Sequence, residues 1–455
     1  MMRRQIRTIF LAGILSLSSL AATTPEPKYL SAPAQINGVS RIMKTAGYWI
    51  GRHPEPDRLI MDPATVGSFN ERLRNSELNV YDLRRLPNPY NGNTIRQMIE
   101  QQVDALQNQE LYDQEGKKVS EKFFKKVRAR MDLINVLEQK DLEFGFVTRF
   151  ADQRMLPTRD GLYAKINDIE FDEVQNSGLD VGTPILILHE SKDKKWIYVL
   201  SEISSGWVEE DRVARSSASE FQSFLGALSF AVITEPKADI YLDPQMKTFH
   251  DHARMGMKFP LLKDDDEQRY MIMLPKRTEK GKMESVIAYV PKAQASAGFL
   301  PYTARTIFEQ AFKLLNEPYG WGDMQGEQDC SRFLQEVFGT VGIILPRDSK
   351  NQAKAGHLIA GFEDKSAGKK IAALEKIPGG GIILTMKGHI MLYLGMIDEK
   401  PYAIHSVWAY RQPDKTDGDI VRVLNRVTLS DLLLGQGSQK GSLLQRMNGI
   451  VEVKK

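Results

Sequence analysis

Cysteine is the scarcest residue type in this chain of 455 residues, because it occurs once, as Cys330. A single cysteine excludes the paired, disulfide-bonded framework that exported proteins commonly use. A free thiol in an oxidising compartment is also open to oxidation. Composition alone leaves two interpretations of Cys330, a buried small hydrophobe or a reactive group.

The chain also lacks an excess of charge of either sign. It has 61 lysines and arginines against 58 aspartates and glutamates, which leaves a net charge of +3. The basic residues are spread along the chain and form no stripe, so we expect no nucleic acid and no membrane surface as a partner.

Histidines are few as well, and they lack the spacing of a metal site. The seven histidines include no H-x-x-x-H pair, and the FHDHAR segment at 249–254 has no further residue at ligand spacing. We therefore expect neither a metal nor another cofactor.

Long apolar runs are missing except near the N-terminus. Arg3, Arg4 and Arg7 precede an apolar stretch over residues 8–20, which is too short to span a bilayer comfortably, and small residues follow it. This pattern predicts a secretory signal peptide over residues 1–22, although an uncleaved anchor is an alternative. We expect an exported protein, periplasmic or extracellular, with no stable membrane insertion after cleavage.

The length and the hydrophobic patterns predict several domains. Residues 26–140 have apolar residues at helical spacing and predict a helical N-terminal domain. Short β-rich runs with polar turns predict a small β-barrel over residues 141–216 and a second one over residues 228–300. Residues 301–455 combine amphipathic helices with strands. The predicted fold class is multidomain α+β.

Cys330 lies at the predicted start of a helix. The apolar residues that follow fall on one helical stripe: Phe333, Leu334, Val337 and Phe338. Asp329 precedes the cysteine and suits the N-cap position. A helix N-terminus carries partial positive charge and unpaired N–H groups, which favour a thiolate and can stabilise the oxyanion of an attacked carbonyl.

Two histidines follow on predicted strands. His389 lies in KGHIMLYLG and His405 in AIHSVWAY, and adjacent antiparallel strands would bring the two rings together. His389 would then act as the base, and His405 would orient its ring. The order of cysteine helix, histidine strand and polar strand matches the papain-type arrangement.

At these residues the chain resembles the NlpC-type (NlpC/p60) family of bacterial cell-wall cysteine peptidases. The resemblance lies in EPYGWGDMQGEQDCSRFLQEVFGTVGIILPRDSKNQA and the two histidine strands, while MKTAGYWIGRHPEPDRLI resembles the start of a helical stabilising domain. It covers the whole chain after the signal peptide. It implies a papain-like catalytic domain preceded by that helical domain and two bacterial SH3-like barrels.

The resemblance also implies roles for individual residues. Cys330 would be the nucleophile, His389 the base and His405 the third residue. The remaining implied oxyanion and substrate-binding residues are Tyr319, Trp321, Asp329, Ser331, Arg332 and Tyr163. Among these, Tyr319 would lie near the oxyanion, while Asp329 and Ser331, helped by a barrel residue such as Tyr163, would hold the free amino end of L-Ala.

The chain departs from the family pattern in three places. Arg332 replaces the usual glycine after Asp-Cys-Ser, and it would either pair with a substrate carboxylate or cover the helix. The loop reads Trp-Gly-Asp instead of Trp-Gly-Gly, and residues 378–380 read Pro-Gly-Gly instead of Pro-Gly-Asp. None of these changes removes a catalytic group, but they leave the substrate preference open.

Multidomain members of this family are γ-D-glutamyl-L-diamino acid endopeptidases. The expected partners are therefore peptidoglycan stem peptides, L-Ala-γ-D-Glu-diamino acid, cut after D-Glu and recognised by a free N-terminal L-Ala. Two alternatives stay open: a non-catalytic wall-binding protein, and a papain-like amide or acyl transferase. The sequence does not distinguish diaminopimelate from lysine at the third position, intact wall from released fragments, or one oligomeric state from another.

Overall fold

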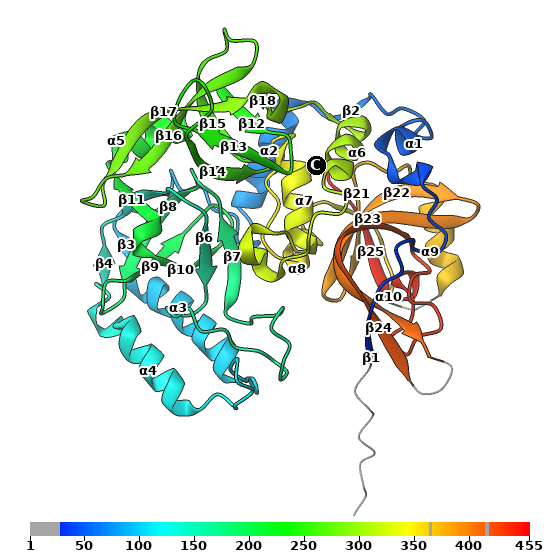
Figure 1. Ribbon diagram of the computed structural model, residues 1–455, viewed down its shortest axis with the longest axis horizontal. Helices are drawn as coiled ribbons and strands as arrows, with labels where there is room; N and C mark the ends of the chain where they lie inside the picture. The colour runs from blue at the N-terminus through cyan, green and yellow to red at the C-terminus, as the bar shows by residue number, and fades with distance from the viewer. Residues whose placement is uncertain (1–27, 364–365, 415–417) are drawn as a thin grey trace, which may run out of the picture.

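The computed structural model describes residues 28–363, 366–414 and 418–455. The predicted signal peptide, residues 1–22, lies outside this part of the chain. Within it, no helix is long and apolar enough to cross a membrane. Three seven-stranded sheets form the body of the molecule, two of them beside each other and the third across from them, with helix α7 (Cys330–Gly339) between (Figure 1).

The third sheet contains both histidine strands. Its order is β1-β24-β23-β22-β21-β25-β20, and every neighbouring pair is antiparallel except the parallel pair of β1 and β24. The strand bounds are β1 Lys28–Ser31, β20 His357–Gly361, β21 Ile382–Met386, β22 His389–Ile397, β23 Lys400–Pro413, β24 Asp419–Asp431 and β25 Met447–Glu452.

Helix α7 packs against this sheet through the predicted apolar stripe. Phe333, Leu334, Val337 and Phe338 are fully buried, in one core with α6 (Ala304–Lys313) and strands β22 and β23. The predicted amphipathic helix that begins at Cys330 is thus confirmed. The shorter helices around this sheet are α8 (Ser349–Gln352), α9 (Ala367–Leu374) and α10 (Leu443–Arg446).

The other two sheets are antiparallel and lie within the ranges predicted for the barrels. The first sheet has the order β11-β5-β8-β9-β10-β6-β7 and the second has the order β14-β13-β17-β16-β15-β12-β18. Their strands are β5 Glu143–Val147, β6 Ala151–Arg154, β7 Gln175–Leu179, β8 Pro184–Glu190, β9 Trp196–Leu200, β10 Ser205–Glu209, β11 Val213–Ser216, β12 Phe230–Ile233, β13 Lys237–Tyr241, β14 Phe249–Arg254, β15 Lys258–Lys263, β16 Arg269–Arg277, β17 Met283–Pro291 and β18 Ala295–Ala297.

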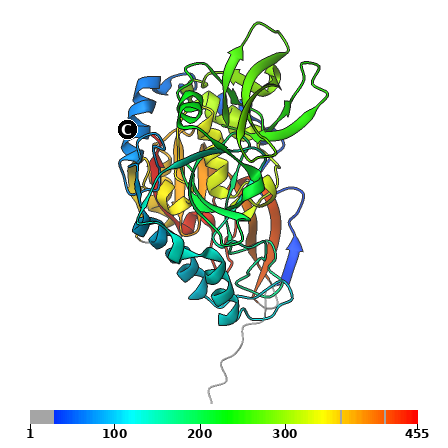
Figure 2. The same ribbon diagram turned by 90° about the vertical axis from the view of Figure 1, so that its left-hand side faces the viewer.

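The prediction of one helical domain over residues 26–140 needs correction. Strand β1 belongs to the third sheet, as both Figure 1 and Figure 2 show. Helices α1 (Ala46–Ile50) and α2 (Pro63–Arg74) share the core of α6 and α7. In contrast, α3 (Gly92–Gln107) and α4 (Glu121–Met131) share the core of the first two sheets.

The division follows from the apolar faces of these helices. Ile95, Ile99 and Val103 form a narrow stripe along α3 and are fully buried. This stripe packs against α4 and joins one core with the buried face of the first sheet. The spacing in the sequence predicts the helices but not which core each one joins.

A network of buried charges joins the three sheets. Asp180, which follows the first sheet's β7, accepts hydrogen bonds from Arg254 of the second sheet (Nε to Oδ1, 2.9 Å) and from Arg332 of α7 (Nη2 to Oδ2, 2.6 Å). All three side chains are less than 9% exposed. Although burial opposes it, the two guanidinium groups lower the pKa of the Asp180 carboxyl.

Asp323 and Arg347 extend this network towards Cys330. The Asp323 carboxylate, fully buried, accepts from the Gly178 backbone N–H at 3.1 Å and pairs with Arg347 at 3.1 Å. Arg347 also donates from Nε to Ser177 Oγ at 2.9 Å. Since removing one member of a buried pair leaves an uncompensated charge, these contacts fix the first sheet against the start of α7.

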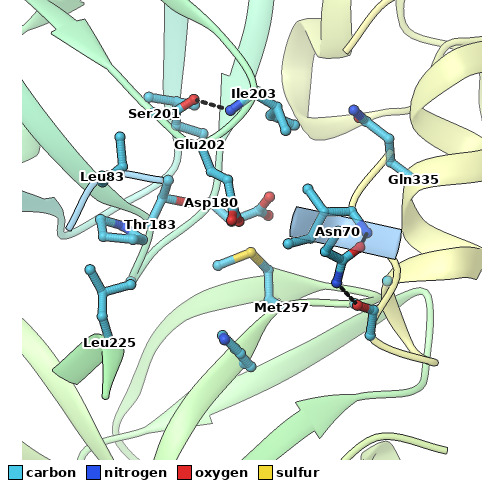
Figure 3. A pocket seen from close by; sticks show the side chains of 18 of the residues that line it. Asn70, Leu83, Asp180, Thr183, Ser201, Glu202, Ile203, Leu225, Met257 and Gln335 are labelled. Atoms are coloured by element: carbon cyan, nitrogen blue, oxygen red, sulfur yellow. Dashed lines mark hydrogen bonds between the residues drawn. The ribbon is translucent and has the colours of Figure 1, made fainter. Parts of the chain in front are cut away.

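A cavity of about 330 Å³ lies beside this network, away from the two histidines. Its walls come from α2, the first and second sheets, and α7. Figure 3 shows Asn70, Asp180, Met257 and Gln335 around it. The Asn70 amide donates to the Gly342 carbonyl at 2.8 Å across the junction. The cavity therefore lies where the parts of the chain meet.

We expect Asp180→Asn to lower the free energy of unfolding by about 3–5 kcal/mol, because it leaves Arg254 and Arg332 buried without their shared carboxylate. Denaturant unfolding measures this loss. Asp57→Asn, which removes the carboxylate of an exposed pair with Arg305, serves as the matched control and should change little. Equal effects of the two substitutions would contradict a structural role for the network.

Candidate active site

The start of α7 holds Cys330 against strand β22. Asp329 caps the helix as predicted, since its Oδ1 accepts from the backbone N–H groups of Ser331 (3.0 Å) and Arg332 (2.8 Å). Cys330 is 8% exposed, and the backbone N–H of Ile390, the second residue of β22, acts to lower the pKa of its thiol, against the larger opposite effect of burial. His389 therefore lies next to the residue whose N–H acts on the thiol.

The two histidines form a hydrogen-bonded chain that ends on a serine. His389 Nε2 lies 2.7 Å from His405 Nδ1, and His405 Nε2 lies 3.1 Å from Ser430 Oγ. The predicted proximity of the two rings is confirmed. Because Nε2 of His389 is engaged, its Nδ1 is the nitrogen left to exchange a proton with Cys330.

Ser430 is a member of this chain that the sequence did not reveal. It lies on β24, opposite Ala403 in the pairing of β23 with β24. A serine in a strand carries no signal of its own, and only the register of that pairing brings it to the buried His405 ring. Like the roles of the histidines, its role in catalysis stays a prediction.

The pKa values of Cys330 and His389 do not favour the thiolate that the sequence predicted. Burial, followed by the neighbouring Asp329 carboxylate, raises the pKa of the Cys330 thiol to about 12. Burial, followed by the charge of Arg446, lowers the pKa of His389 to about 4. Both shifts favour a neutral thiol beside a neutral imidazole at pH 7. The helix N-terminus was expected to stabilise the thiolate, but burial and Asp329 outweigh it.

Tyr319 and Trp321 lie in the cleft beside the histidines, as the sequence predicted. The cleft has a volume of about 430 Å³, and both residues line it together with His389 and His405. Phe171, which precedes β7 in the first sheet, packs its ring against Trp321 at 5.4 Å between centroids and against Tyr319 at 6.4 Å. The first sheet thus supplies part of the cleft wall.

The charged residues that flank Cys330 have protein partners. Arg347 pairs with Asp329 (Nη2 to Oδ2, 2.9 Å), and Ser331 Oγ donates to Asp329 Oδ1 at 2.8 Å. Arg332 donates hydrogen bonds to the carboxylates of Asp180 and Glu336. Asp329 thus already has protein partners, and its predicted role in holding a substrate amine stays a prediction. Of the two options for Arg332, a contact within the protein is the one that the structure contains.

Arg347 was missed in the sequence, although it lies in the LPRDS segment. Its position after a proline-broken turn gave no sign of the carboxylates that it meets. Asp323, one of the departures from the family pattern, is its second partner. The two departures, Asp323 and Arg332, therefore take part in one buried network and do not face the substrate.

Tyr163 does not reach the cleft. Its backbone pairs with Tyr112, its ring is buried, and its hydroxyl accepts from Gln114 Nε2 at 3.4 Å. Residues a few positions further along line the cleft instead: Lys165, Asp168, Phe171 and Glu173. The predicted contact of Tyr163 with the substrate is therefore not supported by its position, since the segment that lines the cleft begins two residues later.

Within the described ranges, no group of three or more histidine, cysteine or acidic side chains has the arrangement of a metal site. The chemistry available from the residues present is a thiol nucleophile, a histidine base and an orienting histidine.

The raised thiol pKa makes a prediction about alkylation. At pH 7 we expect iodoacetamide to modify Cys330 of the folded protein at least tenfold more slowly than the same thiol in the unfolded chain, with the rate rising at alkaline pH. Mass spectrometry of both forms across a pH series measures this. Fast modification of the folded protein below pH 7 would instead show a thiolate–imidazolium pair.

Comparison with known proteins agrees with this geometry. Residues 316–412 match the model of the NlpC/P60 family, and residues 162–209 match that of the SH3 domain of SH3b1 type. An NlpC/P60 endopeptidase from Photobacterium damselae subsp. piscicida has a similar fold, with a TM-score of 0.75 and 20% identity. The alignment covers 94% of this chain and 99% of that one.

Two curated relatives are similar over shorter stretches. A gamma-D-glutamyl-L-lysine dipeptidyl-peptidase of Bacillus subtilis is 35% identical over 94 residues, which is 20% of this chain and 30% of the relative. Its namesake from Bacillus cereus is 26% identical over 189 residues, which is 39% of this chain and 53% of the relative. The chain spans about half or less of these relatives. Residues 316–412, which include α7 and both active-site histidines, nevertheless form an NlpC/P60 family domain, and residues 162–209 form an SH3 domain of the SH3b1 type.

Proposed function

We propose that this protein is a secreted cysteine peptidase that hydrolyses peptidoglycan stem peptides at the γ-D-glutamyl-L-diamino acid bond. One observation carries the proposal: Cys330 at the start of α7 lies against β22, next to the chain of His389, His405 and Ser430, and the two histidines line a cleft that residues of the first sheet help to wall. The names of the two curated relatives support the choice of a γ-D-glutamyl bond.

The reaction begins from the neutral pair. As the substrate carbonyl approaches, Cys330 passes its proton to Nδ1 of His389 and attacks the carbonyl carbon. The oxyanion forms near the N-terminus of α7 and Tyr319, and the imidazolium then protonates the leaving amine. Water hydrolyses the thioester. His405 and Ser430 hold the ring of His389 so that one nitrogen always faces the thiol.

The choice of a free N-terminal L-Ala rests on the acidic side of the cleft. Asp168 and Glu173 line this side of the cleft and belong to residues 165–173, which precede β7 and are called the first-sheet segment. Burial, then the charges of Asp172 and Asp168, raises the pKa of Glu173. A substrate ammonium at this place would relieve that repulsion and would itself be paired when removed from water. We therefore assign the amine-binding role to Glu173 and Asp168 rather than to Asp329, whose carboxylate pairs with Arg347.

The remaining parts of the proposal concern location and domain roles. The basic and apolar start of the sequence supports export to the periplasm or the outside of the cell. The second sheet, like the first, is antiparallel throughout and built of strands close together in the sequence, which supports a second SH3-like unit. The first sheet would shape the cleft, and the second would hold it in position through Arg254.

We expect Cys330→Ala and His389→Ala each to lower kcat/KM on a stem tripeptide by roughly 10³-fold or more, because they remove the nucleophile and its base. His405→Ala and Ser430→Ala should have smaller effects, about 10- to 100-fold, since water can replace an orienting partner. Liquid chromatography with mass spectrometry follows the products, and His357→Ala, an exposed histidine of β20, is the control. Near-normal turnover by Cys330→Ala would refute the proposed function.

Free and N-acetylated forms of the same tripeptide test the closed end of the cleft. We expect acetylation to lower kcat/KM by roughly 100-fold, since it removes the positive charge and adds bulk. Glu173→Gln should reduce cleavage of the free peptide and so bring its kcat/KM closer to that of the acetylated peptide. Asp329→Asn should leave the ratio of the two kcat/KM values unchanged. Equal cleavage of the two peptides by the unaltered protein would refute the requirement for a free L-Ala.

A further inference from the structure

Four cationic side chains line one part of the same cleft. They come from separate places in the sequence: Lys165 of the first-sheet segment, Arg411 of β23, Lys440 of the loop before α10, and Arg446 at the end of α10. The fold thus brings together positive charges that the sequence leaves up to 281 positions apart.

These cations have few protein partners. Arg411 Nη1 lies 3.5 Å from Asp419 Oδ2. Lys165, Lys440 and Arg446 have no carboxylate within 4.0 Å in the part of the chain that the structure describes. These cations repel one another. The pKa of Lys440 is lowered by burial first and then by the charges of Arg411, Arg446 and Lys165. Burial and Arg411 likewise lower the pKa of Arg446.

An arrangement that keeps like charges close together without an anion destabilises the free protein, whereas an anionic ligand would relieve it. The acidic residues of the cleft, Asp168 and Glu173, come from the first-sheet segment, whereas Arg411, Lys440 and Arg446 come from the third sheet and its connections. Apart from Lys165, which lies on the same segment as the carboxylates, the cations of the cleft therefore belong to the wall formed by the third sheet and its connections.

The position of His389 tells which part of the substrate meets the cations. His389 must protonate the leaving amine, which belongs to the diamino acid, so the diamino acid lies on its side of the scissile bond. The charge of Arg446 reaches His389 strongly enough to affect its protonation. Met386, Gly388 and Leu443 line the cleft between β22 and α10, so this wall continues from His389 to Arg446.

We propose that Arg446, Lys440 and Arg411 form an anion-binding subsite for the diamino acid, and that this subsite selects a diaminopimelate-type residue, with its second carboxylate, over lysine. The inference rests on the proposed function, because it concerns the leaving-group side of the same site. A lysine at this position would bring a side chain with a positive charge and no carboxylate towards these cations.

The test compares two free tripeptides that differ only at the third residue, L-Ala-γ-D-Glu-meso-diaminopimelate and L-Ala-γ-D-Glu-L-Lys. Both peptides present the α-carboxylate of the third residue, but only diaminopimelate adds a second carboxylate. For the unaltered protein we expect kcat/KM to be at least about tenfold higher for the diaminopimelate peptide, because that second carboxylate can make a further charge-assisted hydrogen bond. The difference should appear mainly in KM and should shrink as salt concentration rises.

Arg446→Gln and Lys440→Gln should each reduce this preference to about threefold or less. The preference is a ratio of kcat/KM for two peptides with the same variant, so any change that the loss of the Arg446 charge causes at His389 affects both peptides and cancels. Both side chains are exposed, so their loss should not unfold the protein, and thermal unfolding checks this. Lys376→Gln, an exposed lysine outside the cleft, makes the same change of charge and should leave the preference intact.

The outcomes separate the two proposals. Equal cleavage of both peptides by the unaltered protein, or a preference for lysine, would overturn the anion-binding subsite and leave the proposed peptidase standing. A preference that persists in both glutamine variants would also overturn the subsite. Cleavage of neither peptide, with a folded protein and an intact Cys330, would overturn the proposed function itself.

Discussion

The active site depends on a buried network of charges between Asp180, Asp323 and three arginines. These groups are buried away from water, so each needs its partners in place. They come from the first two sheets, from α7 and from the loops on either side of α7. Arg347 is the link, because it pairs with Asp323 at the junction and with Asp329 beside Cys330. The cap of the nucleophile's helix is thereby connected to the packing of the first sheet.

That connection explains why a small β domain belongs to the machinery of a papain-like site. The first sheet is fixed so that Phe171 packs on Trp321 and Glu173 enters the cleft. Without it, the cleft would be open at this end, and a peptide could extend in both directions. The same rigidity keeps Cys330 buried and neutral, so its reactivity depends on the arrival of a substrate.

The local features of the site could be predicted from the sequence, but its long-range contacts could not. The spacing of Phe333, Leu334 and Val337 fixed the helix behind Cys330, and Asp329 was a recognisable cap. The proximity of His389 and His405 followed from two neighbouring strands. In contrast, Ser430, Arg347 and Glu173 depend on strand register and domain docking, which no local pattern encodes. For the same reason the position of Tyr163 does not support its predicted contact, and the N-terminal helices were assigned to one domain.

The pairing of β1 with β24 has a consequence for the order in which the chain folds. Lys28 lies opposite Ile420, so a strand near the start of the described chain pairs with a strand near its end. Contacts of such high sequence separation form late and slowly. The edge of the third sheet, where β24 would otherwise expose unpaired N–H and C=O groups, stays a template for association until β1 covers it. A chain without β1 would leave this edge of β24 unpaired and open to association with other chains, even if every residue of its catalytic cleft were still present.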